Sequence, residues 1–281
     1  MSSSLFVTPE WLAAHLADAD LQLLDARLLP PGQEGDLAAQ FRAQHLPHAR
    51  RFDIEALSDA QSTLPHMLPD AADFSAAMQA LGIWRDHHLV IYDDGSLFSA
   101  PRAWWMLRVF GATRVSVLAG GLAAWQRLGL PVSHGEMAPM VAGVFPAQLD
   151  KRRLRSAAQV LQAVRSGQSQ IVDARAAARF HGHVPEPRPG LRSGHIPTSH
   201  NLPWETLVRD GALQPPEALR ALFHQAGVDL TRPIIASCGS GVTAAVLLLA
   251  LATLGVEETA LYDGAWSEWG ADASLPLEVT V

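Results

Sequence analysis

Cysteine is almost absent from this chain: its 281 residues include only one, Cys238. A single cysteine cannot form an internal disulfide, and it excludes metal sites that are built from several cysteines. The twelve histidines do not occur at His-Glu-x-x-His or comparable ligand spacing. The sequence therefore predicts no metal site, and it contains one side chain capable of thiol chemistry.

Positive charge and long apolar runs are also scarce. The chain has 21 Lys and Arg residues against 28 Asp and Glu, a net charge of −7, which argues against nucleic acid or an anionic membrane as the main partner. The longest apolar run, residues 242–254, is shorter than the roughly 20 residues that span a bilayer. The first residues lack the basic region and long apolar core of a signal peptide. We therefore expect a soluble, cytoplasmic protein.

Apolar residues make up 48% of the chain and charged residues 17%, which is typical of a globular protein with a large core. Short apolar runs typical of buried strands occur at residues 21–24, 89–92 and 115–118, and again at 170–172 and 233–236. Segments typical of helices alternate with these runs. This order predicts an α/β fold in which each half is a mainly parallel sheet flanked by helices.

The two halves of the chain repeat the same short motifs. Asp25-Ala26-Arg27 returns as Asp173-Ala174-Arg175, and Gln44-His45-Leu46-Pro47 returns as Gly194-His195-Ile196-Pro197. Further matches join residues 92–96 to 236–240 and residues 119–121 to 262–264. The offsets between matching motifs are nearly constant, which indicates a duplicated domain rather than a solenoid, whose units run to about 50 residues at most.

We therefore predict two tandem domains, residues 1–134 and residues 156–281, joined by a Pro- and Gly-bearing linker over residues 135–155. In this alignment Asp94 of the first domain stands in place of Cys238 of the second. Only the second domain then carries a thiol, and we expect the first to be non-catalytic. In parallel α/β sheets the ligand crevice lies beyond the carboxyl ends of the strands, which is where Cys238 falls.

Cys238 lies between the apolar run 233–236 and an Ala- and Leu-rich segment, residues 244–254. Gly239 and Gly241 follow it and allow positive φ, so that successive backbone N–H groups can point at one atom. The dipole of the following helix adds to this effect, and both favour the thiolate over the thiol. A cysteine that only packs as a small buried hydrophobe needs no such loop. We therefore interpret Cys238 as a nucleophile.

Several motifs extend this interpretation to a known family. The Cys238–Thr243 loop, on a duplicated framework whose first domain is inactive, resembles that of the bacterial 3-mercaptopyruvate sulfurtransferases. The resemblance extends to four further segments: His66–Pro69, Ser99–Trp105, Glu186–Gly190 and Tyr262–Trp269. It implies two tandem rhodanese-like domains, transfer of sulfur from 3-mercaptopyruvate through a cysteine persulfide, release of pyruvate, and no metal or organic cofactor. The outer sulfur would pass to a thiol such as thioredoxin, to a low-molecular-weight thiol, or to cyanide.

The resemblance also implies roles for individual residues. Arg179 and Arg188 would bind the pyruvoyl end of the substrate, because a guanidinium gives planar recognition of a carboxylate. His45 would work with the loop hydroxyl of Ser240 and an upstream acid, for which Asp36 is the candidate. Alternatively, His45 makes a hydrogen bond that stabilises a turn. The loop residues expected to surround the substrate and the persulfide are Gly239, Gly241, Val242 and Thr243.

The loop separates this interpretation from its alternatives. Phosphatases with a Cys-x5-Arg loop need an arginine six residues after the cysteine, where this chain has Ala244, so phosphoryl chemistry is not expected. Thiosulfate is a dianion, and residues 239–243 carry no charge, which favours a less anionic sulfur donor. A thiosulfate sulfurtransferase, and a sulfur-carrier module that takes sulfur from a desulfurase, remain the alternatives.

Overall fold

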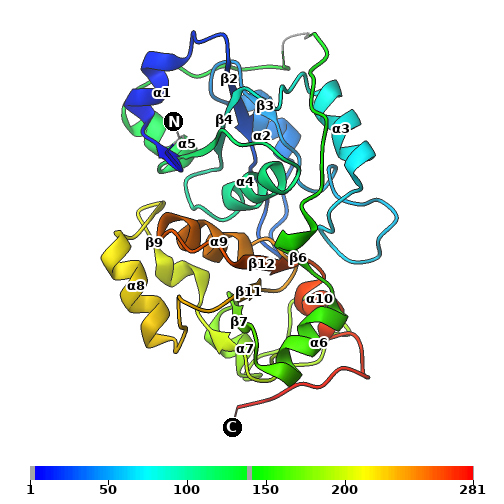
Figure 1. The fold of residues 1–281 in the computed structure, drawn as a ribbon. Helices are drawn as coiled ribbons and strands as arrows, with labels where there is room; N and C mark the ends of the chain where they lie inside the picture. The colour runs from blue at the N-terminus through cyan, green and yellow to red at the C-terminus, as the bar shows by residue number, and fades with distance from the viewer. Residues whose placement is uncertain (1–3, 138–140, 281) are drawn as a thin grey trace. The chain divides into compact units, whose positions relative to one another are not determined.

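The computed structural model describes residues 4–137 and 141–280 (Figure 1). The chain divides into two compact units. The first unit contains the residues up to Asp59, Leu68–Asp150 and Asp210–Ala212. The second unit contains Ala60–Met67, Lys151–Arg209 and the residues from Leu213 onwards. Each unit therefore includes a short segment that lies, in sequence, within the range of the other.

The first unit is built on a five-stranded parallel sheet with strand order β1-β5-β4-β2-β3. The strands are β1 (Phe6–Val7), β2 (Leu21–Asp25), β3 (Arg50–Arg51), β4 (His88–Tyr92) and β5 (Val115–Leu118). The helices are α1 (Pro9–His15), α2 (Leu37–Ala43), α3 (Ala71–Ala80), α4 (Ala100–Val109) and α5 (Gly121–Arg127). Parallel strands need crossover connections, and α1 to α4 lie in them, whereas α5 follows the last strand of the sheet.

The second unit has a sheet of the same design, with strand order β6-β12-β11-β7-β8 and parallel pairing throughout. The strands are β6 (Leu154–Arg155), β7 (Gln170–Asp173), β8 (His200–Asn201), β11 (Ile234–Ser237) and β12 (Thr259–Tyr262). The helices are α6 (Ala157–Ser166), α7 (Ala177–Phe180), α8 (Pro216–Gln225), α9 (Ala244–Thr253) and α10 (Ala265–Trp269), with 3-10 helices η1 (Lys151–Arg153) and η2 (Trp204–Leu207). A small two-stranded sheet pairs β9 (Val208–Arg209) with β10 (Ala212–Leu213). The matching strand orders confirm the predicted α/β fold class and the duplication.

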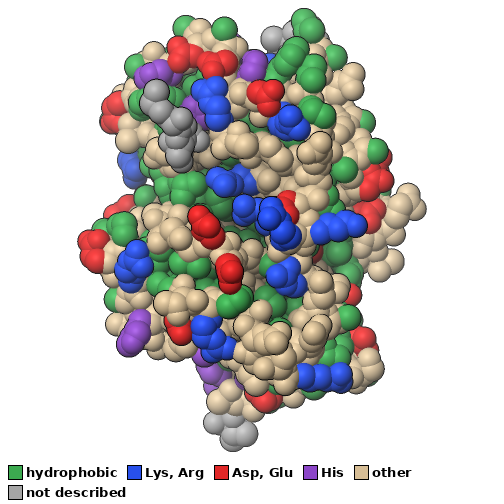
Figure 2. All heavy atoms as spheres, in the orientation of Figure 1, with side chains coloured by type: hydrophobic (Ala, Val, Ile, Leu, Met, Phe, Trp, Pro, Cys, Tyr) green, Lys and Arg blue, Asp and Glu red, His purple; other side chains and the backbone are tan. Residues whose placement is uncertain are grey.

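The central strand of each sheet is buried along its length, since every residue of β4 and β11 is buried. Strands covered on both faces are expected to be nearly continuous apolar runs, and residues 89–92 of β4 and 234–236 of β11 are such runs. The first eight residues of α9 are also buried, which explains why this helix is apolar all round. Charged side chains of both signs are scattered over the face in Figure 2. Among the described residues, no helix could cross a membrane, and no cluster of three or more His, Cys, Asp or Glu could hold a metal ion.

Residues 135–155, which the sequence predicts to be a linker, are divided between the two units, and residues 138–140 lie outside the described part. Up to Asp150 the segment belongs to the first unit: Phe145 is 3% exposed, and the N–H of Gly143 donates to a carbonyl of α3 at 2.9 Å. The last residues form η1 and β6 of the second unit. Backbone groups of this segment form hydrogen bonds with a folded unit. Amino-acid composition alone does not predict these hydrogen bonds.

Candidate active site

Cys238 lies directly after β11, at the carboxyl end of the second sheet, and residues 239–243 connect it to α9. The cysteine is 1% exposed. Helix α10 fixes the start of the loop. The N–H of Trp266 donates to the Cys238 carbonyl (2.9 Å), and the N–H and Oγ of Ser267 donate to the Gly239 carbonyl (3.0 and 2.7 Å). The predicted nucleophile therefore sits in a loop whose backbone is held by a neighbouring helix.

The two glycines of the loop have different roles. Gly241 has a φ of 77°, in the left-handed region that favours glycine. Gly239 has no positive φ, so the prediction of left-handed backbone at this residue is wrong. A Cβ atom at position 239 would instead lie 3.0 Å from Nη2 of Arg179. Glycine at 239 thus makes room for a guanidinium beside the loop.

The loop presents backbone N–H groups that have no protein acceptor. Within residues 4–137 and 141–280, the N–H groups of Gly239, Ser240, Val242 and Thr243 donate no hydrogen bond. Buried N–H groups are normally paired, so a group of open donors in a largely buried loop is unusual. They also lie at the start of α9, where the helix dipole favours negative charge. The surroundings of the cysteine therefore suit a negatively charged sulfur.

The register of the two sheets identifies the residue of the first unit that corresponds to Cys238. The aspartate of the Asp-Ala-Arg motif pairs with Tyr92 in the first unit and with Ser237 in the second. The alanine of each motif donates its N–H to the same residue at 2.8 Å. The next residues are Asp93 and Cys238, so these two are equivalent. The predicted alignment of Asp94 with Cys238 is therefore wrong by one residue.

The carboxylate of Asp93 fills the loop of the first unit. It accepts hydrogen bonds from the N–H groups of Gly95 (2.9 Å), Leu97 (3.3 Å), Ser99 (3.1 Å) and Ala100 (3.2 Å). Asp93 itself is 3% exposed. In the first unit, the loop after the central strand thus binds the side-chain carboxylate of its own first residue. In the second unit, the corresponding N–H groups beside Cys238 have no protein acceptor among the described residues.

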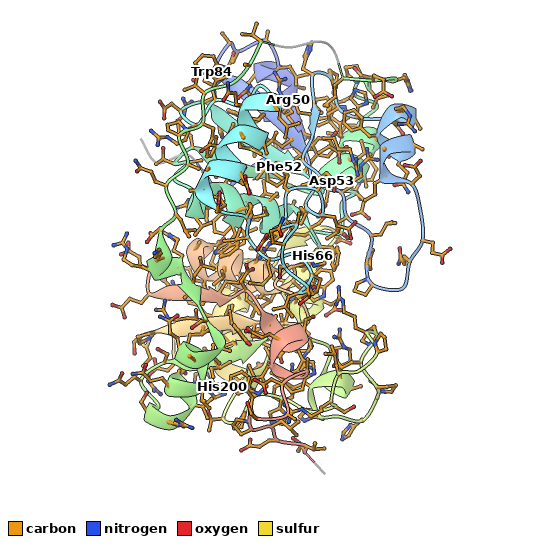
Figure 3. All side chains as sticks on the ribbon, turned by 90° about the vertical axis from the view of Figure 1, so that its right-hand side faces the viewer. Arg50, Phe52, Asp53, His66, Trp84 and His200 are labelled. Carbon is orange, nitrogen blue, oxygen red and sulfur yellow. The ribbon has the colours of Figure 1, made fainter. Side chains whose placement is uncertain are left out.

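The hydroxyl of Ser240 contacts a histidine that the sequence did not assign to the site. Nδ1 of His66, which is labelled in Figure 3, lies 3.1 Å from Oγ of Ser240. Both residues belong to the second unit. His66 has a φ of 60°, which is uncommon for a residue with a side chain, and such strained positions cluster at functional sites. His66 opens one of the motifs shared with the sulfurtransferases. Nothing in its spacing, however, connects it with a loop 174 residues away.

His45, the predicted partner of Ser240, makes different contacts. Its Nδ1 donates to the carbonyl of Phe41 at 2.8 Å, and the two rings stack with their centroids 4.0 Å apart. His195 makes the same hydrogen bond and the same ring contact with Phe180. Both units share this arrangement, while only one of them carries a cysteine. The histidine of this motif therefore serves the fold, which favours the turn-stabilising alternative for His45.

Asp36, the predicted acid partner of His45, caps a helix. Its carboxylate accepts the N–H of Ala39 at 2.8 Å at the start of α2, and it lies 3.9 Å from the guanidinium of Arg42. Its side chain is 65% exposed. An N-cap aspartate typically contributes about 1 kcal/mol to stability, and this role accounts for Asp36 without a part in catalysis.

Arg179 lies beside the loop, and Glu186 orients it. Nε and Nη2 of Arg179 donate to the Glu186 carboxylate, which also accepts a hydrogen bond from Nη1 of Arg175 at 2.8 Å. Nη1 of Arg179 makes no hydrogen bond to any described residue, so it is available to a ligand. Arg188, the second predicted arginine, is partly buried. The sequence did not mark Glu186 as functional, although it lies in one of the shared motifs.

Comparisons with known proteins agree with this architecture. Residues 8–128 and 156–272 each match the rhodanese-like domain family. The chain is 53% identical to the 3-mercaptopyruvate sulfurtransferase of Escherichia coli strain K12, over 99% of both chains. It is 43% identical to a thiosulfate sulfurtransferase of Cricetulus griseus, over 94% of this chain and 91% of the relative. The crystal structure of SseA from Escherichia coli, a 3-mercaptopyruvate sulfotransferase, matches with a TM-score of 0.88 and 51% identity, covering 95% of this chain and 100% of that one.

The duplicated parallel sheet and the single cysteine in an open backbone loop define a cysteine-dependent transferase in which one of two similar units carries the thiol. The two domain matches together cover most of the chain, and the relatives align over nearly all of it. The chain belongs to the rhodanese family. Its first unit shares the family framework but has Asp93 at the position of the cysteine.

Proposed function

We propose that this protein is a sulfurtransferase that takes sulfur from 3-mercaptopyruvate, holds it as a persulfide on Cys238 and passes it to a thiol or to cyanide. The observation that carries the proposal is the group of open N–H donors around Cys238, because the equivalent loop of the first unit binds the carboxylate of Asp93. The 53% identity to the Escherichia coli 3-mercaptopyruvate sulfurtransferase supports the choice of donor.

The first half-reaction is a nucleophilic displacement at sulfur. The Cys238 thiolate attacks the sulfur of 3-mercaptopyruvate and forms an S–S bond, while the C–S bond breaks and its electron pair leaves on pyruvate as the enolate. Arg179 suits the substrate carboxylate, since its Nη1 is open and Glu186 fixes its orientation. Arg188 is the second donor to the pyruvoyl group. Two guanidinium groups would align the substrate sulfur with Cys238 and so lower the entropic cost of the attack.

The enolate needs a proton to become pyruvate, and Ser240 with His66 can supply it. Ser240 is two residues after Cys238 and is 6% exposed. A protonated His66 can return the proton to Ser240 across the 3.1 Å contact, so that the pair acts as a general acid. His66 thereby takes the role that the sequence predicted for His45.

The second half-reaction returns the cysteine to the thiolate. An acceptor thiolate, on thioredoxin or on a low-molecular-weight thiol, attacks the outer sulfur and forms a new S–S bond, and the Cys238 thiolate leaves. Cyanide takes the same sulfur as thiocyanate. Neither half-reaction uses a metal or an organic cofactor. The cytoplasm suits this chemistry because its thiols are kept reduced.

Thiosulfate is the second candidate donor, and the 43% identity to a thiosulfate sulfurtransferase favours it. Residues 239–243 carry no charged side chain, however, and a dianionic donor gains more from a charged loop than 3-mercaptopyruvate does. A sulfur carrier without donor chemistry would have no use for an oriented Arg179 or for the Ser240–His66 contact. These features favour 3-mercaptopyruvate as the donor.

Mass spectrometry after incubation with 3-mercaptopyruvate alone tests the proposal. We expect one added sulfur on Cys238 and a burst of pyruvate equal to the enzyme concentration. The Cys238→Ser variant should show neither, since a hydroxyl is a far weaker nucleophile at neutral pH. Persulfide formed from thiosulfate but not from 3-mercaptopyruvate would select the second candidate. A chain that forms persulfide from neither donor would be a carrier.

A further inference from the structure

A polar depression of about 440 Å³ lies in the second unit, away from Cys238. It is near the amino ends of the parallel strands, whereas the cysteine follows the carboxyl end of β11. Its walls come from η1, β6, α6, the turn before β7 and the start of β11. The residues that carry the argument are Lys151, Arg152, Arg155, Gln159, Gln162 and Ser166.

The charge on the lining is of one sign. Lys151, Arg152 and Arg155 supply three cations, and no Asp or Glu is among the described residues that line the depression. Neither Lys151 nor Arg155 forms an ion pair with any residue that the structure describes. Lys and Arg side chains gather over β6 in Figure 2. Because the whole chain carries a net charge of −7, a concave surface with three cations and no acid differs from the protein's average surface.

The backbone holds the guanidinium of Arg155 in place. Its Nη1 donates to the carbonyls of Arg152 (2.8 Å) and Leu154 (2.6 Å). Nε and Nη2 of Arg155 make no hydrogen bond within the described part of the chain. Arg152 belongs to η1, which packs against β12. A guanidinium that is already positioned and has free donors loses little conformational freedom when it binds a carboxylate or a phosphate.

One face of α6 adds neutral hydrogen-bonding groups. Gln159, Gln162 and Ser166 lie on this face at helical spacing, and the small side chain of Ala163 is buried between them. Gln162 is exposed, and its amide makes no hydrogen bond to any described residue. These amides and the hydroxyl can bind the oxygen atoms of a ligand whose negative charge Lys151 and Arg155 balance.

We propose that this depression is a binding site for a small polyanion that carries two or three phosphate or carboxylate groups. Its volume falls within the roughly 300–1,000 Å³ that is usual for small-molecule sites. Lys151 and Arg155, which form no ion pair with any described residue, can balance negative charge on such a ligand, and arginine binds both kinds of group in bidentate geometry. The site uses none of the sulfur-transfer residues, so the proposal does not depend on the proposed function.

Calorimetric titration of the full chain with inorganic pyrophosphate and with citrate tests for the site and distinguishes phosphate from carboxylate ligands. We expect saturable one-to-one binding of at least one probe, with an affinity that falls as salt rises. Arg155→Gln and Lys151→Gln should each weaken binding by about tenfold, the effect of losing one charge-assisted hydrogen bond. Arg165→Gln should leave the affinity unchanged. It is the matched control, because Arg165 is an exposed cation of α6 outside the lining.

Thermal unfolding of each variant checks the fold. Lys151 is exposed, and its side chain makes no hydrogen bond or ion pair with any residue that the structure describes, so Lys151→Gln keeps the test valid even if Arg155→Gln does not fold. Absence of binding of both probes at millimolar concentration would overturn the proposal. Equal losses in Lys151→Gln and Arg165→Gln would also overturn it, because diffuse surface charge would then hold the probe. Binding of heparin alone would overturn it in favour of a surface for a macromolecule.

Discussion

Asp93 occupies in the first unit the position that Cys238 occupies in the second, and its carboxylate is bound by four backbone N–H groups. A carboxylate oxygen lies two bonds beyond Cβ, as does the outer sulfur of a cysteine persulfide. Asp93 therefore resembles, within the same chain, the anionic intermediate proposed for Cys238. By this comparison we expect no sulfur chemistry from the first unit, because it has no thiol and because its loop is already filled by the Asp93 carboxylate.

Cys238→Asp should convert the second loop into the filled form. The new carboxylate can accept the open N–H groups, at about 1.5–3 kcal/mol for each charge-assisted hydrogen bond, less the cost of burying the charge. We expect loss of sulfur transfer together with a higher melting temperature than that of Cys238→Ala. A crystal structure with the carboxylate turned out of the loop, and no gain in stability, would contradict the equivalence of the two loops.

His66→Gln and His45→Ala should have opposite effects. Loss of the proposed proton donor should lower kcat for 3-mercaptopyruvate by about a hundredfold or more, with the melting temperature nearly unchanged. His45→Ala should cost about 1–3 kcal/mol of stability, from one hydrogen bond and one ring contact, and leave the kcat of the folded protein unchanged. Steady-state pyruvate release and urea unfolding measure the two effects. A large kcat loss in His45→Ala alone would restore the assignment made from the sequence.

The sheets, the duplication and the cysteine loop could be predicted because apolar runs, repeated motifs and the glycine frame are local signals. The equivalence of Asp93 and Cys238 could not be predicted, because either of two successive aspartates, Asp93 or Asp94, can be aligned with the cysteine. The first loop is also longer: α4 begins seven residues after Asp93, whereas α9 begins six residues after Cys238. Only strand pairing decides between the two alignments.

The partner of Ser240 escaped prediction for a different reason. The motif around His45 is repeated around His195 because both histidines pack on a phenylalanine, so the repeat reports the shared fold and not the chemistry. The contact between His66 and Ser240 joins residues 174 positions apart. A contact between residues so far apart in sequence depends on the tertiary structure, and a short sequence motif does not predict it.

Glu186→Gln should weaken substrate binding although it leaves both arginines that contact Glu186, Arg175 and Arg179, in place. The side chain of Glu186 is 1% exposed, and its loss of charge weakens the hydrogen bonds that orient Arg179, while Arg175 stays paired with Asp173. We expect the KM for 3-mercaptopyruvate to rise by about tenfold with a smaller change in kcat. Glu217→Gln, at an exposed position of α8, is the control. A loss confined to kcat would place Glu186 in the chemical step instead.

The stability of the first unit should depend on the protonation of Asp93. Burial, with a smaller contribution from Asp94, raises the pKa of Asp93 above 3.8, while its backbone hydrogen bonds oppose the shift. A carboxyl group whose pKa is raised by folding binds more protons in the folded state, so its contribution to stability falls as the pH rises through the folded pKa. Asp93→Asn cannot titrate. The stability of the wild type relative to this variant should therefore be greatest in acid and decline above pH 3.8.

Urea unfolding of both proteins at a series of pH values measures this difference, in which the other titrating groups cancel. A difference that stays constant with pH would mean that the pKa of Asp93 is the same in the folded and unfolded chains. A difference that grows with pH would mean that folding lowers the pKa of Asp93. The hydrogen bonds from the four N–H groups would then stabilise the ionised carboxylate by more than burial destabilises it.

Charge in residues 239–243 should set the choice of sulfur donor. Gly239→Arg with Ser240→Lys places two cations in the loop, which favours the dianion thiosulfate, and it removes the hydroxyl proposed to protonate the enolate. Gly239 has no positive φ, so the arginine meets no backbone strain there. Its Cβ would instead lie 3.0 Å from Nη2 of Arg179, and the two guanidinium groups would repel each other. Displacement of Arg179 adds to the expected loss with 3-mercaptopyruvate.

Turnover of the double variant should therefore fall on 3-mercaptopyruvate and rise on thiosulfate, each by about tenfold or more if one charge-assisted contact is lost or gained. Gly239→Ala is the control, because it adds the Cβ atom and its contact with Arg179 without adding charge. If Gly239→Ala shifts the donor ratio as far as the double variant does, space beside Arg179 selects the donor. The double variant could instead melt like the wild type and leave the ratio of the two turnover rates unchanged. Arg179 and Arg188 would then select the donor. In that case the single alanine variants of Arg179 and Arg188 should raise the KM for 3-mercaptopyruvate more than the KM for thiosulfate.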